Sequence, residues 1–366
     1  MKYFNNVDNL LFFKDPQAFN KYTDKNILKY AIGANMYMPG TQSNIFEKLI
    51  HNKFQDIGAI TLCCEDAIAE TEVEDAENNI IQILDDLYLK CIDDNELLNT
   101  LPLIFIRVRN TEQFKHIISK MSKEELRMLT GFNFPKFNSL NGNIYFSILK
   151  DLSKQYNEVL YGMPIIEDSN VIYRETRIGE LKAIQDTLNK YSNLVLNVRV
   201  GGTDFSSLFG LRRNMENSIY DLRVVADCLS DIINVFTRNE NYVVSGPVWE
   251  YFSWDENSKE IEGLKKELKL DIQNGFQGKT IIHPSQINVV NREYIVNYSE
   301  YQDAYKIINS EGGVFKGEDG NRMNETAPHT NWAKKILARA SIFGVYDKNA
   351  RLWGDYYVFK RKFRTN

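Results

Sequence analysis

Eight short apolar runs constrain the fold of this 366-residue chain more than any other sequence feature. Each run is bounded by turn-forming residues, and most neighbouring runs are separated by a stretch with helical spacing of apolar residues. Continuous runs such as LPLIFIRV are typical of parallel strands, because both faces of a parallel sheet are buried. The runs cover residues 35–38, 59–62, 103–108, 133–134, 163–166, 194–200, 242–244 and 280–282.

Helix-like segments lie between these runs. Residues 70–89 and 221–236, for example, place apolar side chains at helical spacing behind a polar face. Alternating strands and helices predict repeated βα units and a parallel sheet. Eight such units predict an α/β fold, a (β/α)₈ TIM barrel, for which 366 residues leave room for an appendage.

The sequence changes character after Gln286. Residues 289–310 read as a helix, residues 311–321 are rich in glycine and charge, and residues 330–342 read as a second helix. We therefore expect three regions: an N-terminal extension (1–30), a TIM barrel (31–290) and a C-terminal helical extension (291–366).

Composition excludes several classes of partner. The net charge of −5 gives no basic field for nucleic acid or for an anionic membrane surface. No apolar stretch approaches the ~20 residues that cross a bilayer, and the N-terminus lacks signal-peptide architecture. The four cysteines include the adjacent Cys63 and Cys64 and form no CxxC pair. We expect a reduced, cytoplasmic chain without a structural zinc.

Charged or polar residues follow nearly every apolar run. In TIM barrels the reactive residues lie at the C-terminal ends of the strands, so these positions are the candidates for a site. They are Glu65, Asp66, Arg107, Arg109, Asn110, Lys136, Glu167, Asp168, Gly201, Gly202, Thr203, Asp204 and His283.

Glu167 and Asp204 are the best candidates for metal ligands. Carboxylates from separate strands form a hard oxygen site that suits Mg²⁺, with Mn²⁺ as the second candidate. Both residues could instead be ordinary carboxylates at strand ends. Glu65 and Asp66 are better placed to hold metal-bound waters, although acidic residues at this point are also favoured by the N-terminus of a helix.

Other residues at the same edge predict anion binding. The segment from Gly201 to Thr203 lets backbone N–H groups approach a ligand closely, and Arg107 can hold a carboxylate with two hydrogen bonds. Together they would bind a 2-oxo acid and stabilise its enolate. Lys136 is a further candidate for binding the substrate, although it could simply close a turn, and Arg107 could also form a structural ion pair.

Four further residues have a structural interpretation beside the functional one. His283 is expected to orient its loop more often than to act in catalysis. Cys63 is expected to be a small buried residue and not a nucleophile. Arg212 and Arg213 could meet phosphate or acyl groups, or could form a solvated pair.

An ordered series of motifs resembles the citrate lyase β-subunit and malyl-CoA lyase superfamily, the HpcH/HpaI aldolase-like TIM-barrel lyases. The resemblance runs from about residue 31 to about residue 345, and its most specific segment is GFQGKTIIHPSQI. The other segments are MYMPG, LCCEDAI, FIRVRN, FPK, PIIED, GGTDF, GGVF and DGNRM.

The resemblance implies a Mg²⁺-dependent carbon–carbon lyase that works through a metal-stabilised enolate. It implies Glu167 and Asp204 as metal ligands, Glu65 and Asp66 as the outer acidic pair, and Arg107 as the arginine that binds the oxo-acid carboxylate. A small oxo acid is the implied substrate, with a CoA thioester as a further candidate. It also implies a homo-oligomer, a trimer or hexamer, in which a C-terminal acidic residue, here nearest to Glu325, reaches a neighbouring active site.

The chain departs from the family pattern at two points. Cys63 stands where the family usually has aspartate, and Gly33 or its neighbours replace an arginine before the first strand. The chain is similar to a divergent branch found with bacterial stress and tellurite-resistance gene clusters. Two alternatives therefore stay open: an inert barrel that acts as a scaffold in a stress-response complex, and an enzyme of a biosynthetic pathway with another product.

Overall fold

The computed structural model describes residues 1–5, 11–51, 53–94, 96–238 and 241–348. The contacts divide the chain into two compact units. One unit is Asn20–Val290, and the other joins Met1–Phe19 to the residues from Asn291 onward. The larger unit holds the predicted site residues, with the exception of Glu325.

The larger unit is built on an eight-stranded parallel sheet in the order β8-β7-β6-β5-β4-β3-β2-β9. An isolated parallel bridge between Gly246 and Lys279 joins its two ends, so the sheet is a nearly closed barrel. The predicted TIM-barrel fold is confirmed. The strands are β2 (Ala34–Pro39), β3 (Ala59–Cys63), β4 (Leu103–Arg107), β5 (Gly131–Phe134), β6 (Tyr161–Ile166), β7 (Val198–Val200), β8 (Val244–Ser245) and β9 (Lys279–Ile281).

Two of the expected strands differ in extent. The run 194–200 was expected to be one strand, but a 3₁₀ helix, η3 (Ser192–Leu194), covers its start and β7 begins only at Val198. The run 242–244 gives the two-residue strand β8. Both runs are apolar because they are buried. Apolar character alone does not distinguish a strand from a buried segment that leads into a strand.

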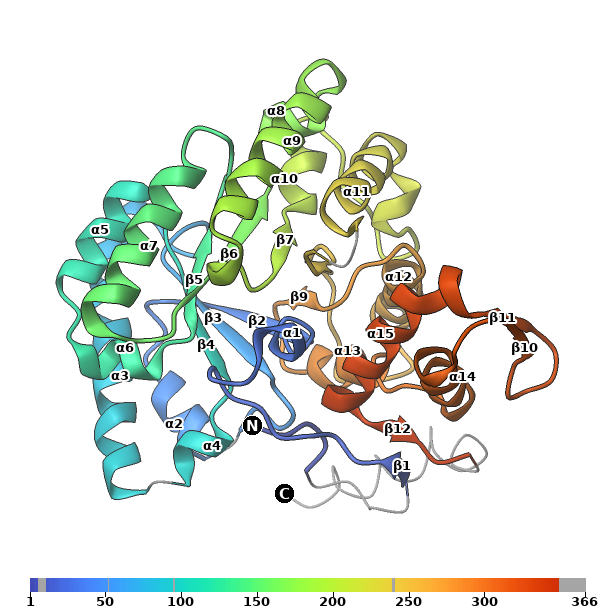
Figure 1. The fold of residues 1–366 in the computed structure, drawn as a ribbon. Coiled ribbons are helices and arrows are strands. Elements are labelled where there is room, and N and C mark those ends of the chain that lie inside the picture. The colour runs from blue at the N-terminus through green and yellow to red at the C-terminus, as the bar shows by residue number, and fades with distance from the viewer. Residues whose placement is uncertain (6–10, 52, 95, 239–240, 349–366) are drawn as a thin grey trace. The chain divides into compact units, whose positions relative to one another are not determined.

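Helices surround the strands in Figure 1, as the alternation predicted. In α11, for example, Val225, Leu229 and Ile232 are buried while the opposite face carries charge. The described helices of this unit are α1 (Lys25–Leu28), α2 (Ile45–Ile50), α3 (Val73–Asp93), α4 (Leu97–Thr100), α5 (Thr111–Ser119), α6 (Lys123–Met128), α7 (Gly142–Tyr156), α8 (Ser169–Ile172), α9 (Arg174–Lys190), α10 (Gly202–Ser207), α11 (Arg223–Phe236), α12 (Lys259–Gln273) and α13 (Gln286–Arg292), which runs across the boundary of the unit; the 3₁₀ helices are η2 (Glu70–Glu72), η3 and η4 (Ile219–Asp221).

The barrel interior contains polar side chains that bond to one another. The Thr61 hydroxyl donates to Oδ1 of Asn35 at 3.0 Å. The Asn133 amide donates to the hydroxyl oxygens of Thr61 at 3.0 Å and of Tyr37 at 2.9 Å. Burying such groups is affordable because they pair with each other. They also place the Tyr37 ring at a fixed position.

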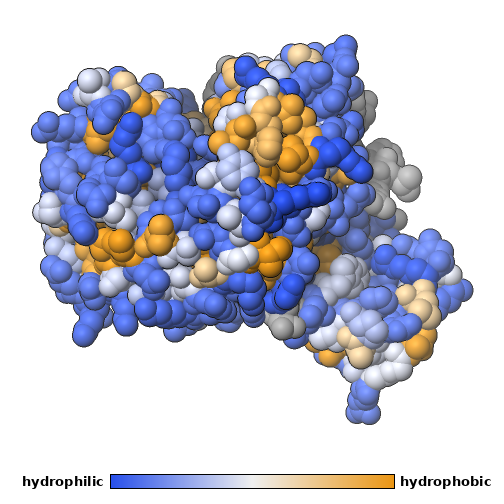
Figure 2. Space-filling model, turned by 90° about the horizontal axis from the view of Figure 1, so that it is seen from above, coloured by the Kyte–Doolittle hydropathy of each residue, from blue (hydrophilic) through white to orange (hydrophobic). Residues whose placement is uncertain are grey.

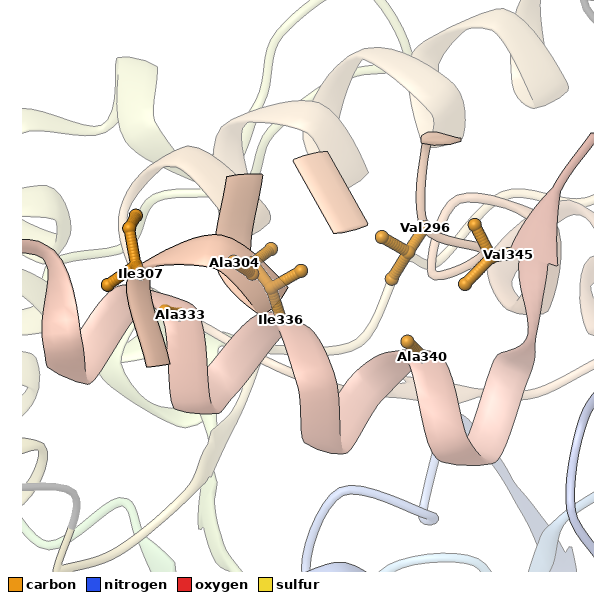
Figure 3. Packing of buried hydrophobic residues seen from close by; sticks show 7 residues of the cluster. All are labelled: Val296, Ala304, Ile307, Ala333, Ile336, Ala340 and Val345. Atoms are coloured by element: carbon orange, nitrogen blue, oxygen red, sulfur yellow. The ribbon is translucent and has the colours of Figure 1, made fainter. Parts of the chain in front are cut away.

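The smaller unit combines both ends of the chain. Strand β1 (Phe12–Lys14) pairs with β12 (Val345–Tyr346), and β10 (Val314–Lys316) pairs with β11 (Met323–Glu325), both antiparallel. Helices α14 (Tyr298–Asn309) and α15 (Thr326–Phe343) pack on each other. Figure 3 shows the apolar cluster between them: Val296, Ala304, Ile307, Ala333, Ile336, Ala340 and Val345.

The expected single helix at 289–310 is wrong. The structure has α13 up to Arg292 and α14 from Tyr298, because the intervening Val296 bridges to Val345. A residue that pairs with an extended strand cannot continue a helix. The expected helix at 330–342 begins earlier, at Thr326, and α15 runs to Phe343.

Among the described residues, no helix has both the length and the apolar character required to cross a membrane.

Candidate active site

A cavity of about 610 Å³ opens where the barrel strands end. Ligand sites in TIM barrels occupy this edge, and the volume lies in the range of small-molecule sites. Eight of the residues singled out from the sequence line this cavity, namely Cys63, Asp66, Arg107, Glu167, Gly201, Gly202, Thr203 and Asp204.

Glu167 and Asp204 approach each other beside the backbone of Gly201. Glu167 directly follows β6, and Asp204 lies in the first turn of α10, which follows β7. A Cβ atom built on Gly201 would lie 2.2 Å from Oε2 of Glu167 and 3.1 Å from Oδ2 of Asp204. These two oxygens are therefore at most about 5.3 Å apart. The missing side chain of Gly201 leaves the space that both carboxylates face.

The other oxygen of Glu167 is already bonded. Its Oε1 accepts hydrogen bonds from the Lys136 backbone N–H at 2.9 Å and from Nη2 of Arg107 at 3.2 Å. Burial, with the charge of Asp204, raises the pKa of Glu167 to about 8 although Arg107 opposes the shift. The buried carboxyl thus favours its neutral form at neutral pH unless a second cation, in addition to Arg107, lies beside it.

Arg107 joins three carboxylates. Its Nη2 lies 2.6 Å from Glu65, 3.1 Å from Asp66 and 3.2 Å from Glu167. Burial would lower the pKa of the guanidinium, but the carboxylates of Glu167 and Glu65 raise it above its usual value. Arg107 is the last residue of β4, and the acidic residues follow β3 and β6, so barrel closure brings them together.

Lys136 and the acidic pair complete this network. The Lys136 ammonium binds Glu65 and lies 3.8 Å from Asp66. Burial raises the pKa of Glu65, whereas a hydrogen bond from Glu65 and the charge of Arg107 lower the pKa of Asp66 despite its partial burial. Lys136 adopts a left-handed backbone with φ of 45°, and its backbone N–H donates to Glu167.

The arrangement fits a hard divalent cation with few protein ligands. Mg²⁺ commonly takes one or two carboxylates and keeps several waters, and Glu167 and Asp204 offer one unshared oxygen each at the same space. Among the described residues, no group of three or more His, Cys, Asp or Glu side chains could hold a metal ion. Carboxylate oxygens are the hard ligands that Mg²⁺ prefers, whereas zinc favours Cys and His.

Sequence reasoning missed Arg199 and Tyr37. Arg199 lies in β7 with 1% of its surface exposed, and its Nη2 donates to the Thr280 hydroxyl at 2.5 Å. The Tyr37 ring faces the guanidinium groups of Arg199 and Arg107, at 5.7 and 6.0 Å from the ring centre. Both missed residues leave a signal in the sequence, since an arginine or a tyrosine inside an apolar strand is buried only at a cost in free energy.

Two other candidates, His283 and Cys63, contact neighbouring groups of the protein. The His283 ring stacks on Phe252 with ring centres 4.2 Å apart, and its Nδ1 lies 2.8 Å from the Ser285 hydroxyl. Cys63 lines the cavity, and its sulfur accepts the N–H of Glu65 at 3.4 Å.

The two adjacent arginines of the sequence behave differently. Arg213 is buried, lies 3.5 Å from Glu267 and packs over Trp249, so a solvated pair is wrong for it. Arg212 is exposed and lies 3.6 Å from Glu250.

Glu325 belongs to the smaller unit. It ends β11, and its backbone N–H donates to Nδ1 of His329 at 2.9 Å. Its part in a neighbouring active site stays a prediction.

Exposed apolar side chains occur after α10 and in the loop after β8. They include Leu208, Phe209, Leu211, Phe252 and Trp254, the last with 72% of its surface exposed. Figure 2 shows hydrophobic residues gathered in separate patches among polar ones on the face that it presents.

A family model described as the C-C bond lyase of the TIM-barrel fold matches residues 26–345 of this chain. The chain belongs to this family. The matched region includes Glu167, Asp204, Arg107 and the acidic pair formed by Glu65 and Asp66. All of these candidate residues therefore lie within the part of the chain that the family model matches. The relation to TIM-barrel carbon–carbon bond lyases that the motifs predicted is confirmed.

Relatives of known identity are distant. The mitochondrial citramalyl-CoA lyase of Mus musculus is 23% identical over 293 residues, which is 75% of each chain. Among solved structures, a citrate lyase from Burkholderia xenovorans has a TM-score of 0.60 at 14% identity, covering 88% of this chain and 96% of its own. The CitE protein of Mycobacterium tuberculosis, in complex with magnesium, acetoacetate and coenzyme A, has a TM-score of 0.54 at 19% identity and covers 85% and 99%. These structures share the fold.

Proposed function

We propose that this protein is a Mg²⁺-dependent carbon–carbon lyase that acts on a 2-oxo acid or a β-hydroxyacyl substrate. The observation that carries the proposal is the pair formed by Glu167 and Asp204, whose free oxygens face one space beside Gly201 at the mouth of the barrel. The C–C bond lyase family supplies the reaction class. The residues around the pair supply what such a reaction requires.

Each group then has a physical task. Glu167 and Asp204 would hold Mg²⁺, or Mn²⁺ in its place, and such an ion acts as a Lewis acid for enolate charge. Glu65 and Asp66 would accept hydrogen bonds from water at the ion. Arg107 and Lys136 fix these carboxylates in place, and Gly202 and Thr203 line the wall where a ligand would approach.

The charge of the site fits a monoanionic acid. With Glu167 ionised, as metal binding requires, three cationic side chains and four carboxylates leave one negative charge in excess. A divalent cation changes this to one positive charge. A single carboxylate then balances the site, and a negative field no longer repels it. The groups counted are Arg107, Lys136, Arg199, Glu65, Asp66, Glu167 and Asp204.

Relatives support the substrate class. The CitE structure holds magnesium, acetoacetate and coenzyme A, and a malate synthase from Haloferax volcanii, with a TM-score of 0.54, holds magnesium and glyoxylate. A CoA thioester is therefore a candidate substrate here, and pyruvate, glyoxylate or oxaloacetate are candidate oxo acids.

Calorimetric titration with Mg²⁺ tests the metal site. We expect binding to the wild type and a loss of at least tenfold in affinity in Glu167→Gln and in Asp204→Asn. Asp168→Asn is the matched control, because Asp168 is adjacent to Glu167 but caps α8, a task that asparagine also performs. Unchanged affinity in both site variants would refute this assignment of ligands.

A second measurement separates an enzyme from an inert barrel. Cys63 lies in the cavity wall where the family motif has aspartate, and this substitution is the observation that favours a scaffold. We expect β-hydroxyacyl thioesters with Mg²⁺ to release an oxo acid or acetyl-CoA. The scaffold would be favoured if the wild-type protein binds Mg²⁺ but releases no product, and if the Cys63→Asp variant does release product.

Three finer expectations stay predictions. They are the trimeric or hexameric homo-oligomer, the action of Glu325 in a neighbouring active site, and the link to stress or tellurite-resistance gene clusters. Mixing Glu325→Gln with Glu167→Gln tests the first two together. Partial recovery of activity in the mixture would require that one chain supplies Glu325 and another supplies Glu167.

A further inference from the structure

Tyr37 lies in β2 and lines the same cavity as Glu167 and Asp204. Its side chain is half-buried. The proposed reaction gives it no task, yet its hydrogen bonds and its charged neighbours assign one. This inference rests on the proposed function, because it concerns the carboxylate of the same oxo acid.

The hydrogen bonds inside the barrel fix which way the Tyr37 hydroxyl bonds. The Thr61 hydroxyl has one hydrogen and donates it to Oδ1 of Asn35 at 3.0 Å, so toward Asn133 it can only accept. Asn133 must therefore turn its NH₂ group toward Thr61. The same NH₂ group lies 2.9 Å from the Tyr37 hydroxyl oxygen. That oxygen accepts, and the hydrogen of Tyr37 is left for another partner.

The hydroxyl hydrogen of Tyr37 has no acceptor in the protein. A phenol can accept and donate at once, but none of the residues that the structure describes accepts a hydrogen bond from Tyr37. A half-buried donor without an acceptor costs free energy, and water or a ligand normally satisfies it. In the wall of a substrate cavity, this donor is available to the substrate.

The charges around the Tyr37 ring favour an anionic acceptor. The guanidinium carbons of Arg107 and Arg199 lie 6.0 and 5.7 Å from the ring centre. Their positive charges act through space, whatever groups their N–H hydrogens bond to. A negatively charged oxygen at the hydroxyl is therefore favoured over a neutral one.

The hydroxyl is also close enough to the carboxylate pair. Nη2 of Arg107 lies 3.2 Å from Oε1 of Glu167, which places the Tyr37 ring centre within roughly 11 Å of that oxygen. A small oxo acid that is bound to an ion at Glu167 and Asp204 can bridge this distance. One of its carboxylate oxygens then remains for the hydroxyl.

We propose that Tyr37 donates its hydroxyl hydrogen to the carboxylate of the oxo-acid substrate and is a specificity-determining residue of the site. Asn133 is the positioning residue that keeps this hydrogen free by donating to the hydroxyl oxygen. The ligand class is a small 2-oxo monocarboxylate.

Calorimetric titration of Tyr37→Phe with pyruvate at saturating Mg²⁺ tests the proposal. Phenylalanine keeps the ring beside the two guanidinium groups and removes only the hydroxyl. We expect pyruvate binding to weaken roughly 10- to 100-fold, the effect of losing a hydrogen bond to a charged group. Mg²⁺ affinity should change less than about threefold.

Tyr242→Phe is the matched control. It removes another tyrosine–asparagine hydrogen bond, since the Tyr242 hydroxyl donates to Asn189 at 2.8 Å, at a position outside the cavity lining. It should leave both affinities unchanged. Tyr37→Phe is expected to fold, because the Asn133 amide keeps Thr61 as a partner.

Pyruvamide, which has a neutral amide in place of the carboxylate, separates substrate contact from a structural role. Wild-type protein should prefer pyruvate, and this preference should be several-fold smaller in Tyr37→Phe, because a hydrogen bond to a charged oxygen is the stronger one. A purely structural effect of the hydroxyl would weaken both compounds alike.

Three results would overturn the proposal. They are unchanged pyruvate affinity in Tyr37→Phe, an unchanged preference for pyruvate over pyruvamide in that variant, and, if the variant does not fold, equal affinity of the wild type for the two compounds. Wild-type protein that binds no Mg²⁺, or binds Mg²⁺ without any oxo acid, would instead refute the proposed function.

Discussion

Nη2 of Arg107 lies 2.6 Å from Oε2 of Glu65, and both side chains are more than nine-tenths buried. A buried ion pair of this kind is expensive to break from one side, because the remaining carboxylate loses its counter-charge without regaining water. Two further carboxylates share the same nitrogen. The stability of the site therefore depends on this one guanidinium.

Arg107→Met should destabilise the protein by about 3–5 kcal/mol, since it leaves buried carboxylates unpaired. Urea unfolding followed by circular dichroism measures this change. Glu65→Gln is the comparison, because it removes one carboxylate and leaves the arginine paired; we expect a smaller loss. A change below about 1 kcal/mol in Arg107→Met would mean that water replaces the ion pairs.

Gly201→Ala should abolish Mg²⁺ binding. Its Cβ would lie 2.2 Å from Oε2 of Glu167, a distance that real Cβ atoms essentially never show, so the Glu167 carboxylate must leave its position beside Gly201. Gly179→Ala is the matched control. Gly179 lies inside α9 with no atom within 4 Å of the added Cβ, and alanine should stabilise that helix by about 0.5–1 kcal/mol. Full Mg²⁺ affinity in Gly201→Ala would place the ion elsewhere.

Mg²⁺ affinity should depend on pH through Glu167. Burial raises the pKa of this carboxyl to about 8 in the metal-free protein, so below pH 8 the ion must displace a proton. The apparent affinity should fall about tenfold for each pH unit below 8 and level off above it. Calorimetry in buffers of different ionisation enthalpy should detect about one proton released per ion at pH 6 and almost none at pH 9. A flat profile would show that another group, not Glu167, faces the ion.

Lys279→Met should destabilise the barrel by about 3–5 kcal/mol. Lys279 has no exposed surface and pairs with Glu267 at 2.9 Å and Asp271 at 2.7 Å. Lys259→Met is the matched control, since Lys259 forms an exposed pair with Glu216 at 3.7 Å and should change stability by less than about 1 kcal/mol. Equal losses of unfolding free energy in Lys279→Met and Lys259→Met would contradict the expectation that the buried ion pairs contribute more to stability than the exposed one.

The sequence located Glu167 and Asp204 because both follow apolar runs, and a parallel barrel collects strand ends at one edge. That argument needs only local pattern. It could not give the partners of Arg107, since these depend on how barrel closure brings the ends of β3, β4 and β6 together. It also missed Arg199, because one arginine inside an apolar run does not alter the strand pattern.

The helix break between Arg292 and Tyr298 was missed for a similar reason. Helical spacing of apolar residues continues across the break in the sequence. What interrupts the helix is the pairing of Val296 with Val345, which lies far along the chain. Local periodicity cannot reveal a competing partner at such a distance.

The smaller unit draws on both chain ends, and this sets an order of events during synthesis. The backbone N–H of Gln17 bonds to the Ser341 carbonyl, and the Tyr3 ring stacks on Phe343. Tyr3 and Gln17 are therefore made more than 300 residues before the partners that they contact. At about 5–20 residues per second the wait lasts roughly 15–65 s. During that interval the aromatic side chains of the N-terminal segment lack their final neighbours, whereas Asn20–Val290 has the whole sequence of its barrel as soon as residue 290 is made. A nascent chain that pauses before residue 341 would thus carry a complete barrel and an unsatisfied, aggregation-prone N-terminus.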